Sequence, residues 1–137
     1  KSAARAAHAC LAAAQAGDRK PFRAYIDRPA LRADLRRQLE AQARAQGDLR
    51  PFDEGAINRM IEPEAFSIQG VTGLGLSGVP GPGQVALMMK VLPDGRACLV
   101  EPAIPPRCVL TFQQQGSRWR LVQVAAGDMD IVRSPRP

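Results

Sequence analysis

The stretch DRPALRADLRRQLEAQARAQG, residues 27–47, decides how the rest of the chain is arranged. Asp27 suits a helix N-cap, the proline two residues later costs no hydrogen bond in a first turn, and Gly47 ends the pattern. The leucines recur every four residues and form one apolar stripe along a helix predicted over residues 29–45. They are Leu31, Leu35 and Leu39. This stripe requires an apolar partner surface elsewhere in the chain.

A β-sheet built from the last third of the chain is the predicted partner of this stripe. Residues 108–114 and 118–124 flank Gln115-Gly116-Ser117, and their alternating apolar side chains are typical of a β-hairpin. Four apolar side chains are predicted on its buried face, namely Leu110, Phe112, Trp119 and Leu121.

A second hairpin is predicted just before the first. The apolar run of residues 85–92 and the run of residues 96–100 flank Pro93-Asp94-Gly95, a strong turn signal. Residues 70–83, GVTGLGLSGVPGPG, are too rich in Gly and Pro for regular structure, so they predict a long loop or an irregular edge. The sheet is therefore expected to have about four antiparallel strands.

Helices are predicted to fill the first half of the chain. Residues 1–18 are rich in alanine, which favours a helix, and Gly17 is placed to end that helix. Residues 18–25 form a short connector that carries Phe22 and Tyr25 toward the core. A third helix is predicted from Asp53 and Glu54 onward. The expected fold class is α+β, with the helices packed on one face of a curved antiparallel sheet. Residues 1–125 would form this single domain, and residues 126–137 a C-terminal tail.

The excess positive charge lies in the helical half. The chain of 137 residues has a net charge of +6, and residues 1–50 hold eleven Lys or Arg against five acids, whereas residues 51–137 hold eight against eight. A basic surface could bind nucleic acid, anionic lipid or an acidic partner. We interpret the excess instead as a compositional bias spread over solvated helix faces, so nucleic acid is not the expected partner.

The sequence contains no segment of the kind that crosses or targets a membrane. No apolar run approaches the ~20 residues that span a bilayer, and no stretch combines a charged start with a continuous apolar core, as a signal peptide does. The first residue is Lys1, not Met. We hypothesise that an export signal or a membrane anchor precedes it.

Three segments together resemble a known bacterial family. They are AGDRKPFRAYIDRPALRADLRRQLEAQ at residues 16–42, MIEPEAF at 60–66 and RCVLTFQQQGSRWRLVQVA at 107–125. They are similar to the domain of unknown function 2939, and the most specific piece is YIDRPALR at residues 25–32. The order of helices and sheet resembles the cystatin-like, or nuclear transport factor 2-like, cone. The family resemblance implies a secreted or envelope-associated domain with no assigned activity, and it supplies no catalytic residue.

No convergent catalytic motif is recognisable. Three glycines have the spacing of G-x-G-x-x-G, namely Gly73, Gly75 and Gly78, but we expect that the following residues 79–83 cannot open the helix that a phosphate site needs. His8 is the only histidine, which excludes a multi-histidine metal site. Asp128 and Asp130 could act as acid and base at a cone opening, or could simply cap or solvate the chain end. We predict no catalytic residue, no metal and no cofactor.

The three cysteines offer testable chemistry. Cys98 and Cys108 lie symmetrically about Ala103, between two predicted neighbouring strands, so strand pairing would place them opposite each other and within reach of a disulfide. The alternative is a pair of buried free thiols, and the sequence alone allows three pairings. Cys10 would be left unpaired and buried.

Binding is the predicted type of function. We expect a non-catalytic domain of the bacterial periplasm or cell envelope that contacts another protein or itself. The first alternative is a small apolar ligand held on the concave face of the sheet, in a pocket lined by Met88, Met89, Phe112 and Trp119. Further alternatives are a cone-fold isomerase or hydratase, and nucleic-acid binding through the arginine-rich helix.

Overall fold

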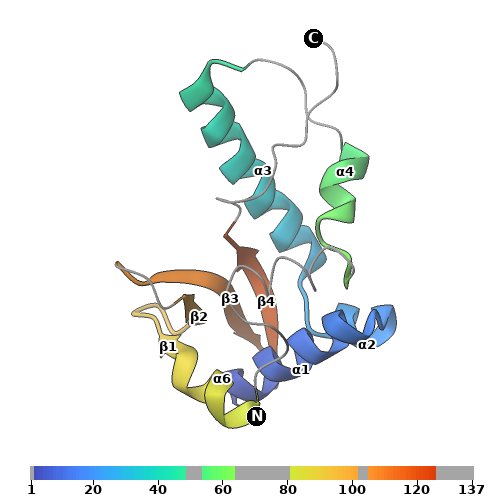
Figure 1. Ribbon diagram of the computed structural model, residues 1–137, viewed down its shortest axis with the longest axis vertical. Coiled ribbons are helices and arrows are strands. Elements are labelled where there is room, and N and C mark those ends of the chain that lie inside the picture. Colours follow the sequence, from blue (N-terminus) through green and yellow to red (C-terminus); the bar gives the residue numbers. More distant parts are fainter. Residues whose placement is uncertain (1, 49–53, 64–80, 102–104, 126–137) are drawn as a thin grey trace.

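The computed structural model describes residues 2–48, 54–63, 81–101 and 105–125 and shows helices followed by an antiparallel sheet (Figure 1). The helices are α1 (Ala3–Ala16), α2 (Arg19–Ala24), α3 (Arg28–Gln46), α4 (Glu54–Arg59) and α6 (Pro82–Met88). The strands are β1 (Met89–Val91), β2 (Ala97–Glu101), β3 (Arg107–Gln115) and β4 (Arg118–Val124). This confirms the predicted α+β class. The sheet is open, and its layout is compatible with the cystatin-like cone.

The first helix ends at the predicted residue, Gly17, and begins after Ser2. The Ser2 side chain caps α1 by accepting a hydrogen bond from the backbone N–H of Arg5 at 3.2 Å. Gly17 ends α1 in a left-handed conformation with φ of 68°, which a side chain would disfavour. The buried face of α1 consists of small and apolar residues: Ala6, Ala7, Cys10, Leu11 and Ala14.

The helix that carries the leucine stripe is also confirmed. Asp27 caps α3, its carboxylate accepting from the Ala30 N–H at 3.1 Å, and Gly47 ends α3 with φ of 68°. All three leucines of the stripe are buried, and Leu31 and Leu35 join the main hydrophobic core. Among the described residues, no helix has both the length and the apolar character needed to cross a bilayer.

The four strands form an antiparallel meander in the order β1-β2-β3-β4. At the Pro93-Asp94-Gly95 turn, Asp94 accepts hydrogen bonds from the backbone N–H of Arg96 at 3.1 Å and from its Nε at 2.7 Å. Gly116 joins β3 to β4 with φ of 66°. Both predicted turns are therefore present.

The register assigns the side chains to two sheet faces. Leu99 is paired with Leu110, and Phe112 with Leu121, so these apolar residues share one face. The intervening residues Cys98, Thr111 and Gln123 are also paired with one another and lie on the other face. One face is thus apolar and the other mainly polar.

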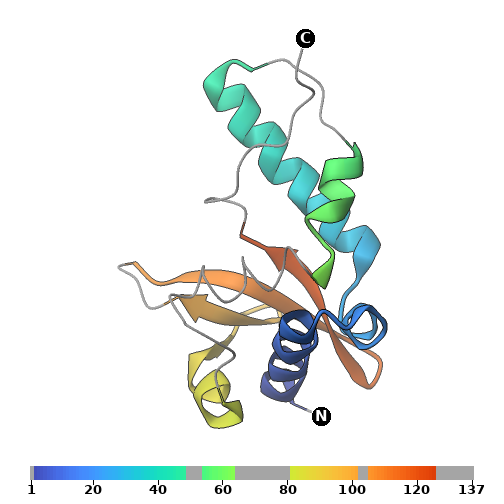
Figure 2. The ribbon, with the colours of Figure 1, turned by 45° about the vertical axis from the view of Figure 1, so that its right-hand side comes forward.

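Helices approach the sheet from both sides, so the prediction that they all pack on one face is wrong. α1 contacts β3 and β4, and α6 contacts α1 and β2. The segment between α2 and α3 runs beside β4, where the Leu121 N–H donates to the Tyr25 carbonyl at 2.8 Å and the Asp27 N–H donates to the Leu121 carbonyl at 2.9 Å. From there α3 rises along β4, and Figure 2 shows it on the side of the sheet away from α1 and α6.

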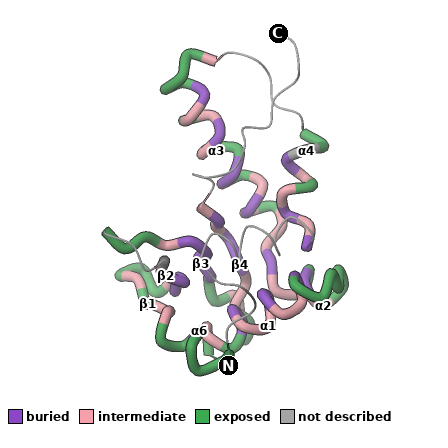
Figure 3. The backbone as a smooth tube through the Cα atoms, viewed as in Figure 1, coloured by how far each residue is buried: buried purple, intermediate pink, exposed green. Residues whose placement is uncertain are grey.

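The hydrophobic core lies between α1 and the apolar face of the sheet. Phe22 of α2 and Phe112 of β3 are its largest side chains, and both are fully buried. Leu31 and Leu35 extend this cluster from the start of α3, whereas exposed residues line the outer faces of the helices (Figure 3). The predicted docking of the leucine stripe against the last third of the chain is therefore present.

The strand predicted over residues 85–92 is wrong in its first half. Residues 82–88 form α6, and only Met89–Val91 are extended. A strand would bury Val85 and Leu87 on the same face, but Val85 is 0% exposed and Leu87 is 89% exposed, as expected of a helix packed on α1. The apolar run suits either structure, and packing against α1 selects the helix.

The expectation that residues 79–83 cannot open a helix is also wrong. Pro82 is the first residue of α6, where its missing N–H is not needed by the helix. Pro82 and Gly83 therefore belong to a helix instead of the predicted loop. Residues 70–80 and the tail predicted over residues 126–137 lie outside the described residues.

Candidate functional site

A pocket with aromatic walls lies between α1 and the start of β4. Its volume is about 460 Å³, within the roughly 300–1,000 Å³ of small-molecule sites. Three segments line it, with Arg5, Ala6, His8 and Ala9 from α1, Ala24 and Tyr25 from the end of α2, and Arg118 and Trp119 from β4. We call this cavity the α1–β4 pocket.

Two local arrangements bring these residues together. Arg5, His8 and Ala9 are three and four residues apart on α1, so they lie on one face of that helix. Backbone pairing between Tyr25 and Leu121 holds the end of α2 beside β4. The side chains of His8, Tyr25 and Trp119 are partly buried, so each leaves part of its ring surface exposed.

The α1–β4 pocket is positively charged and has no acidic lining residue. Arg5 and Arg118 are exposed, and within the described ranges neither guanidinium forms an ion pair. The alanines and rings offer apolar surface, and the two guanidiniums offer hydrogen-bond donors for an anion. Chemically, the pocket can hold an apolar body and an acceptor group.

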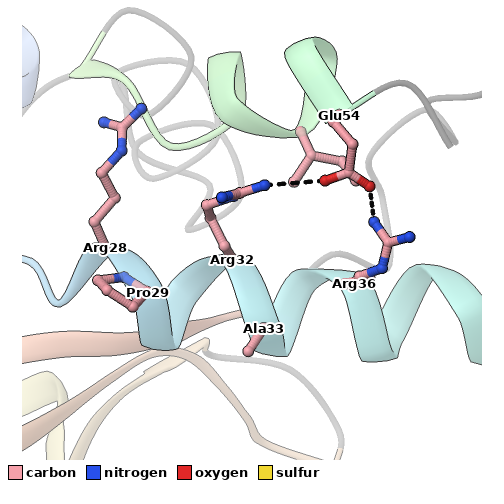
Figure 4. Close-up of a pocket in the computed structure, with 7 residues that line it drawn as sticks. Arg28, Pro29, Arg32, Ala33, Arg36 and Glu54 are labelled. Carbon is pink, nitrogen blue, oxygen red and sulfur yellow. Dashed lines mark hydrogen bonds and ion pairs between the residues drawn. The ribbon is translucent and has the colours of Figure 1, made fainter.

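A second cavity, of about 410 Å³, lies between α3 and α4. Arg28, Arg32 and Arg36, four residues apart on α3, line it with Pro29, Ala33, Glu54 and Ile57 (Figure 4). Arg32 Nη2 donates to Glu54 Oε1 at 3.0 Å, and Arg36 Nη1 donates to the other carboxylate oxygen. Glu54 therefore offsets part of the positive charge that an anion would need, and it links α4 to α3.

Glu62 has the same effect at the N-terminal end of α3. Arg28 Nη1 donates to Glu62 at 2.8 Å, and the guanidiniums of Arg23 and Arg19 lie 3.4 Å and 3.9 Å away. The side chain of Glu62 is 17% exposed. This partial burial alone would raise the pKa of Glu62, but hydrogen bonding and charge from Arg28, helped by Arg23, outweigh it and hold the pKa below 4.5. The arginines predicted to be simply solvated are in part ion-paired.

Replacing Glu62 by Gln is expected to lower the free energy of unfolding at pH 7 by about 1 kcal/mol, because three guanidiniums lose their shared carboxylate. A depressed pKa stabilises the folded state above the ordinary pKa, and this stabilisation is lost as pH falls through the lowered value. The difference between the two proteins should therefore shrink below about pH 4.5. Urea unfolding of both proteins at several pH values measures this difference in the free energy of unfolding.

The matched control is Glu40→Gln, because the side chain of Glu40 is about half exposed and its ion pair within the described residues is a long one, with Arg36 at 4.0 Å. It should change the stability by less than about 0.5 kcal/mol. Equal effects of the two substitutions at pH 7 would show that the Glu62 cluster adds nothing beyond an ordinary surface ion pair.

A third cavity, of about 300 Å³, lies where α3 meets the polar sheet face. Asp34 is only 7% exposed there and accepts hydrogen bonds from Gln38 at 2.6 Å, Gln123 at 3.2 Å and Arg37 at 3.3 Å. Gln38 also donates to the Val124 carbonyl at 2.8 Å. Sequence reasoning missed this buried acid, although its position beside Leu35 on the inward helix face was a signal. Its partners indicate a polar link between α3 and β4.

The cysteines form the predicted bridge. Cys98 and Cys108 are joined by a disulfide, with Cα atoms 5.5 Å apart. Their symmetric positions about Ala103 predicted that they lie directly opposite each other. They do not, because the register shifts after Leu99 and pairs Cys108 with Val100. Cys10 is free and buried, and burial raises the pKa of its thiol to about 12. The bridge therefore links β2 to β3.

The residues of the predicted apolar pocket occupy different environments. Met88 and Met89 are partly buried against the core, Phe112 is fully buried, and Trp119 lines the α1–β4 pocket. His8, the only histidine of the sequence, lines that same pocket. In the described parts of the chain, no group of three or more His, Cys, Asp or Glu could hold a metal ion.

The other residues considered as site candidates from the sequence are not among the described residues. The glycines of the G-x-G-x-x-G pattern and the two aspartates of the C-terminal segment lie outside the described residues, namely Gly73, Gly75, Gly78, Asp128 and Asp130.

Comparison with known proteins supports the family resemblance. A family model described as protein of unknown function (DUF2939) matches residues 2–67. Residues 16–42 and 60–66, on which the resemblance rested, lie inside this match, whereas residues 107–125 lie beyond it. Neither a curated protein nor a solved structure matches the chain. The match therefore covers α1 to α4 and assigns no activity.

Proposed function

We propose that this chain, in which residues 2–67 match the DUF2939 family, is a non-catalytic domain of the bacterial cell envelope that binds a small ligand. The observation that carries this proposal is the α1–β4 pocket. Its aromatic and alanine walls give apolar contact area, and its guanidiniums can orient a polar group. The site differs from the pocket expected from the sequence and shares only Trp119 with it.

The proposed location in the envelope is supported by the disulfide. Disulfides persist in oxidising compartments such as the periplasm and are rare in the cytosol. Cys98 is fully buried and Cys108 partly buried, so the bridge is part of the folded sheet. A domain held in this way is suited to an extracytoplasmic environment.

Native mass spectrometry after incubation with a small-molecule extract of bacterial envelopes tests ligand binding. Ala9→Phe places a ring inside the α1–β4 pocket, whereas Ala16→Phe adds the same ring at the exposed end of α1. We expect a small bound mass on the wild type and on Ala16→Phe, and its loss by at least tenfold in Ala9→Phe, because one ring occupies much of a site of this size. No bound mass on any variant, or equal binding by all three, would contradict the function.

Protein contact through a second copy of the chain is the other candidate. Leu87 of α6 and Val91 of β1 are 89% and 76% exposed, and among the described strands β1 pairs only with β2. An exposed edge of this kind can pair with another strand. The same native spectra should then show a dimer that Leu87→Gln weakens, and a wild type that is monomeric at tens of micromolar would exclude it.

Nucleic-acid binding is not part of the proposal. Arg28, Arg32 and Arg36 of α3 are engaged with Glu62 and Glu54, so a phosphate backbone would have to compete with these carboxylates for them. That exchange would reduce the gain from counterion release.

A further inference from the structure

We propose that the ligand of the α1–β4 pocket is a small organic anion, with one carboxylate on an aromatic or fatty apolar body. This inference rests on the proposed function and adds the charge of the ligand to it. It depends on a contrast between two arginine-lined cavities of similar volume, of which one contains its own carboxylate and the other does not.

The cavity between α3 and α4 is lined by arginines that are already ion-paired. Its arginines Arg28, Arg32 and Arg36 each have a carboxylate partner, Glu62 for the first and Glu54 for the other two. An added anion would meet negative charge already in place. The ion pairs of this cavity are therefore suited to holding α4 on α3.

The α1–β4 pocket has the opposite composition. Arg5 and Arg118 come from two different elements, and the lining includes no Asp or Glu to neutralise either one. Two like charges at one cavity are unfavourable until an anion joins them. A carboxylate accepts two parallel hydrogen bonds from a guanidinium, so it matches the donors that these arginines present.

The rest of the lining defines the body of the ligand. His8, Tyr25 and Trp119 provide ring surface, and Ala6, Ala9 and Ala24 provide short walls that leave room beside the rings. Flat rings and alkyl chains gain most from such surfaces. A polyanion would not fit this description, because it offers charge without an apolar body. The pocket therefore favours one charged group on a compact apolar molecule.

Two fluorescent probes with the same body test the inference. 8-Anilinonaphthalene-1-sulfonate carries one negative charge, and N-phenyl-1-naphthylamine is its neutral counterpart. We expect the anionic probe to bind the wild type about tenfold more tightly, because hydrogen bonds to a charged acceptor are stronger than those to a neutral one. The double substitution Arg5→Gln with Arg118→Gln should remove this preference and leave the neutral probe unchanged. Arg44→Gln, which removes an exposed charge from α3, should change neither affinity.

Competition identifies the source of the carboxylate. Displacement of the anionic probe by 2-naphthoate would indicate an aromatic acid, and displacement by decanoate a fatty acid. Each acid should displace it at about one tenth of the concentration needed of the matching alcohol.

The failures of the two proposals are distinguishable. The two probes could bind the wild type with equal affinity, lose that affinity in Ala9→Phe and keep it in the double arginine variant. The pocket would then bind ligands, but the proposed charge preference would be wrong. If Ala9→Phe leaves both affinities unchanged, the probes bind elsewhere and the proposed function fails together with the inference.

Discussion

Replacing Phe112 by Ala is expected to lower the free energy of unfolding by about 3–5 kcal/mol. Phe112 lies in the middle of β3, where it is paired with Ala97 on one side and Leu121 on the other, and it is fully buried. Removing its ring leaves a cavity that the surrounding strands and α1 can only partly fill. Urea unfolding followed by circular dichroism measures the loss.

The control is Trp119→Ala, because Trp119 lies at the edge of the same hairpin, is only partly buried and lines the α1–β4 pocket. Its cost should be clearly smaller, since part of the ring is already in contact with solvent. If Phe112→Ala does not fold, Phe112→Leu should still be less stable than the wild type. A cost below about 1 kcal/mol for Phe112→Ala would mean that Phe112 faces an open pocket, as expected from the sequence.

Features encoded by neighbouring residues could be predicted. The caps of α3 at Asp27 and Gly47 have side chains and backbone angles that depend on a few adjacent residues. The hairpin turns at Pro93-Asp94-Gly95 and at Gly116 are equally local. The run of residues 85–92 was harder, because its apolar side chains suit a helix or a strand and the packing of Val85 on α1 decides between them.

The α1–β4 pocket could not be predicted because it is assembled from three distant segments. Tyr25 comes beside Trp119 only through the backbone pairing of residues 25–27 with Leu121, which has no short-range signal. The ion pairs of α3 are non-local in the same way, since Glu54 is 22 residues from Arg32. Spacing along one helix identifies which arginines share a face, but not which acids approach them.

The family match covers only part of the α1–β4 pocket. Arg5, His8 and Tyr25 lie within residues 2–67, whereas Arg118 and Trp119 lie beyond that range. The part of the pocket on α1 and α2 thus belongs to the segment that the family model matches. The charge preference, however, needs Arg118 from the hairpin. The proposed ligand class therefore depends on both halves of the chain.

Replacing Cys98 and Cys108 together by Ala is expected to lower the free energy of unfolding by about 2–3 kcal/mol. The disulfide closes a short loop, with a sequence separation of 10, and a cross-link of this length restricts the unfolded chain by roughly that amount. Dithiothreitol should destabilise the wild type similarly and leave the double variant unchanged. Urea unfolding with and without the reductant measures both effects.

Cys10→Ala is the matched control, because Cys10 is buried on α1 and its thiol, with a pKa of about 12, stays protonated at neutral pH. This variant should keep its response to dithiothreitol, whereas the double variant should lose it. When cells that produce the protein are quenched in acid and the protein is then alkylated in denaturant, Cys98 and Cys108 should stay unmodified while Cys10 reacts, because a disulfide has no free thiol and persists in an oxidising compartment. Three alkylated cysteines would refute both the bridge in the cell and the proposed envelope location, since the domain would then reside where thiols are kept reduced.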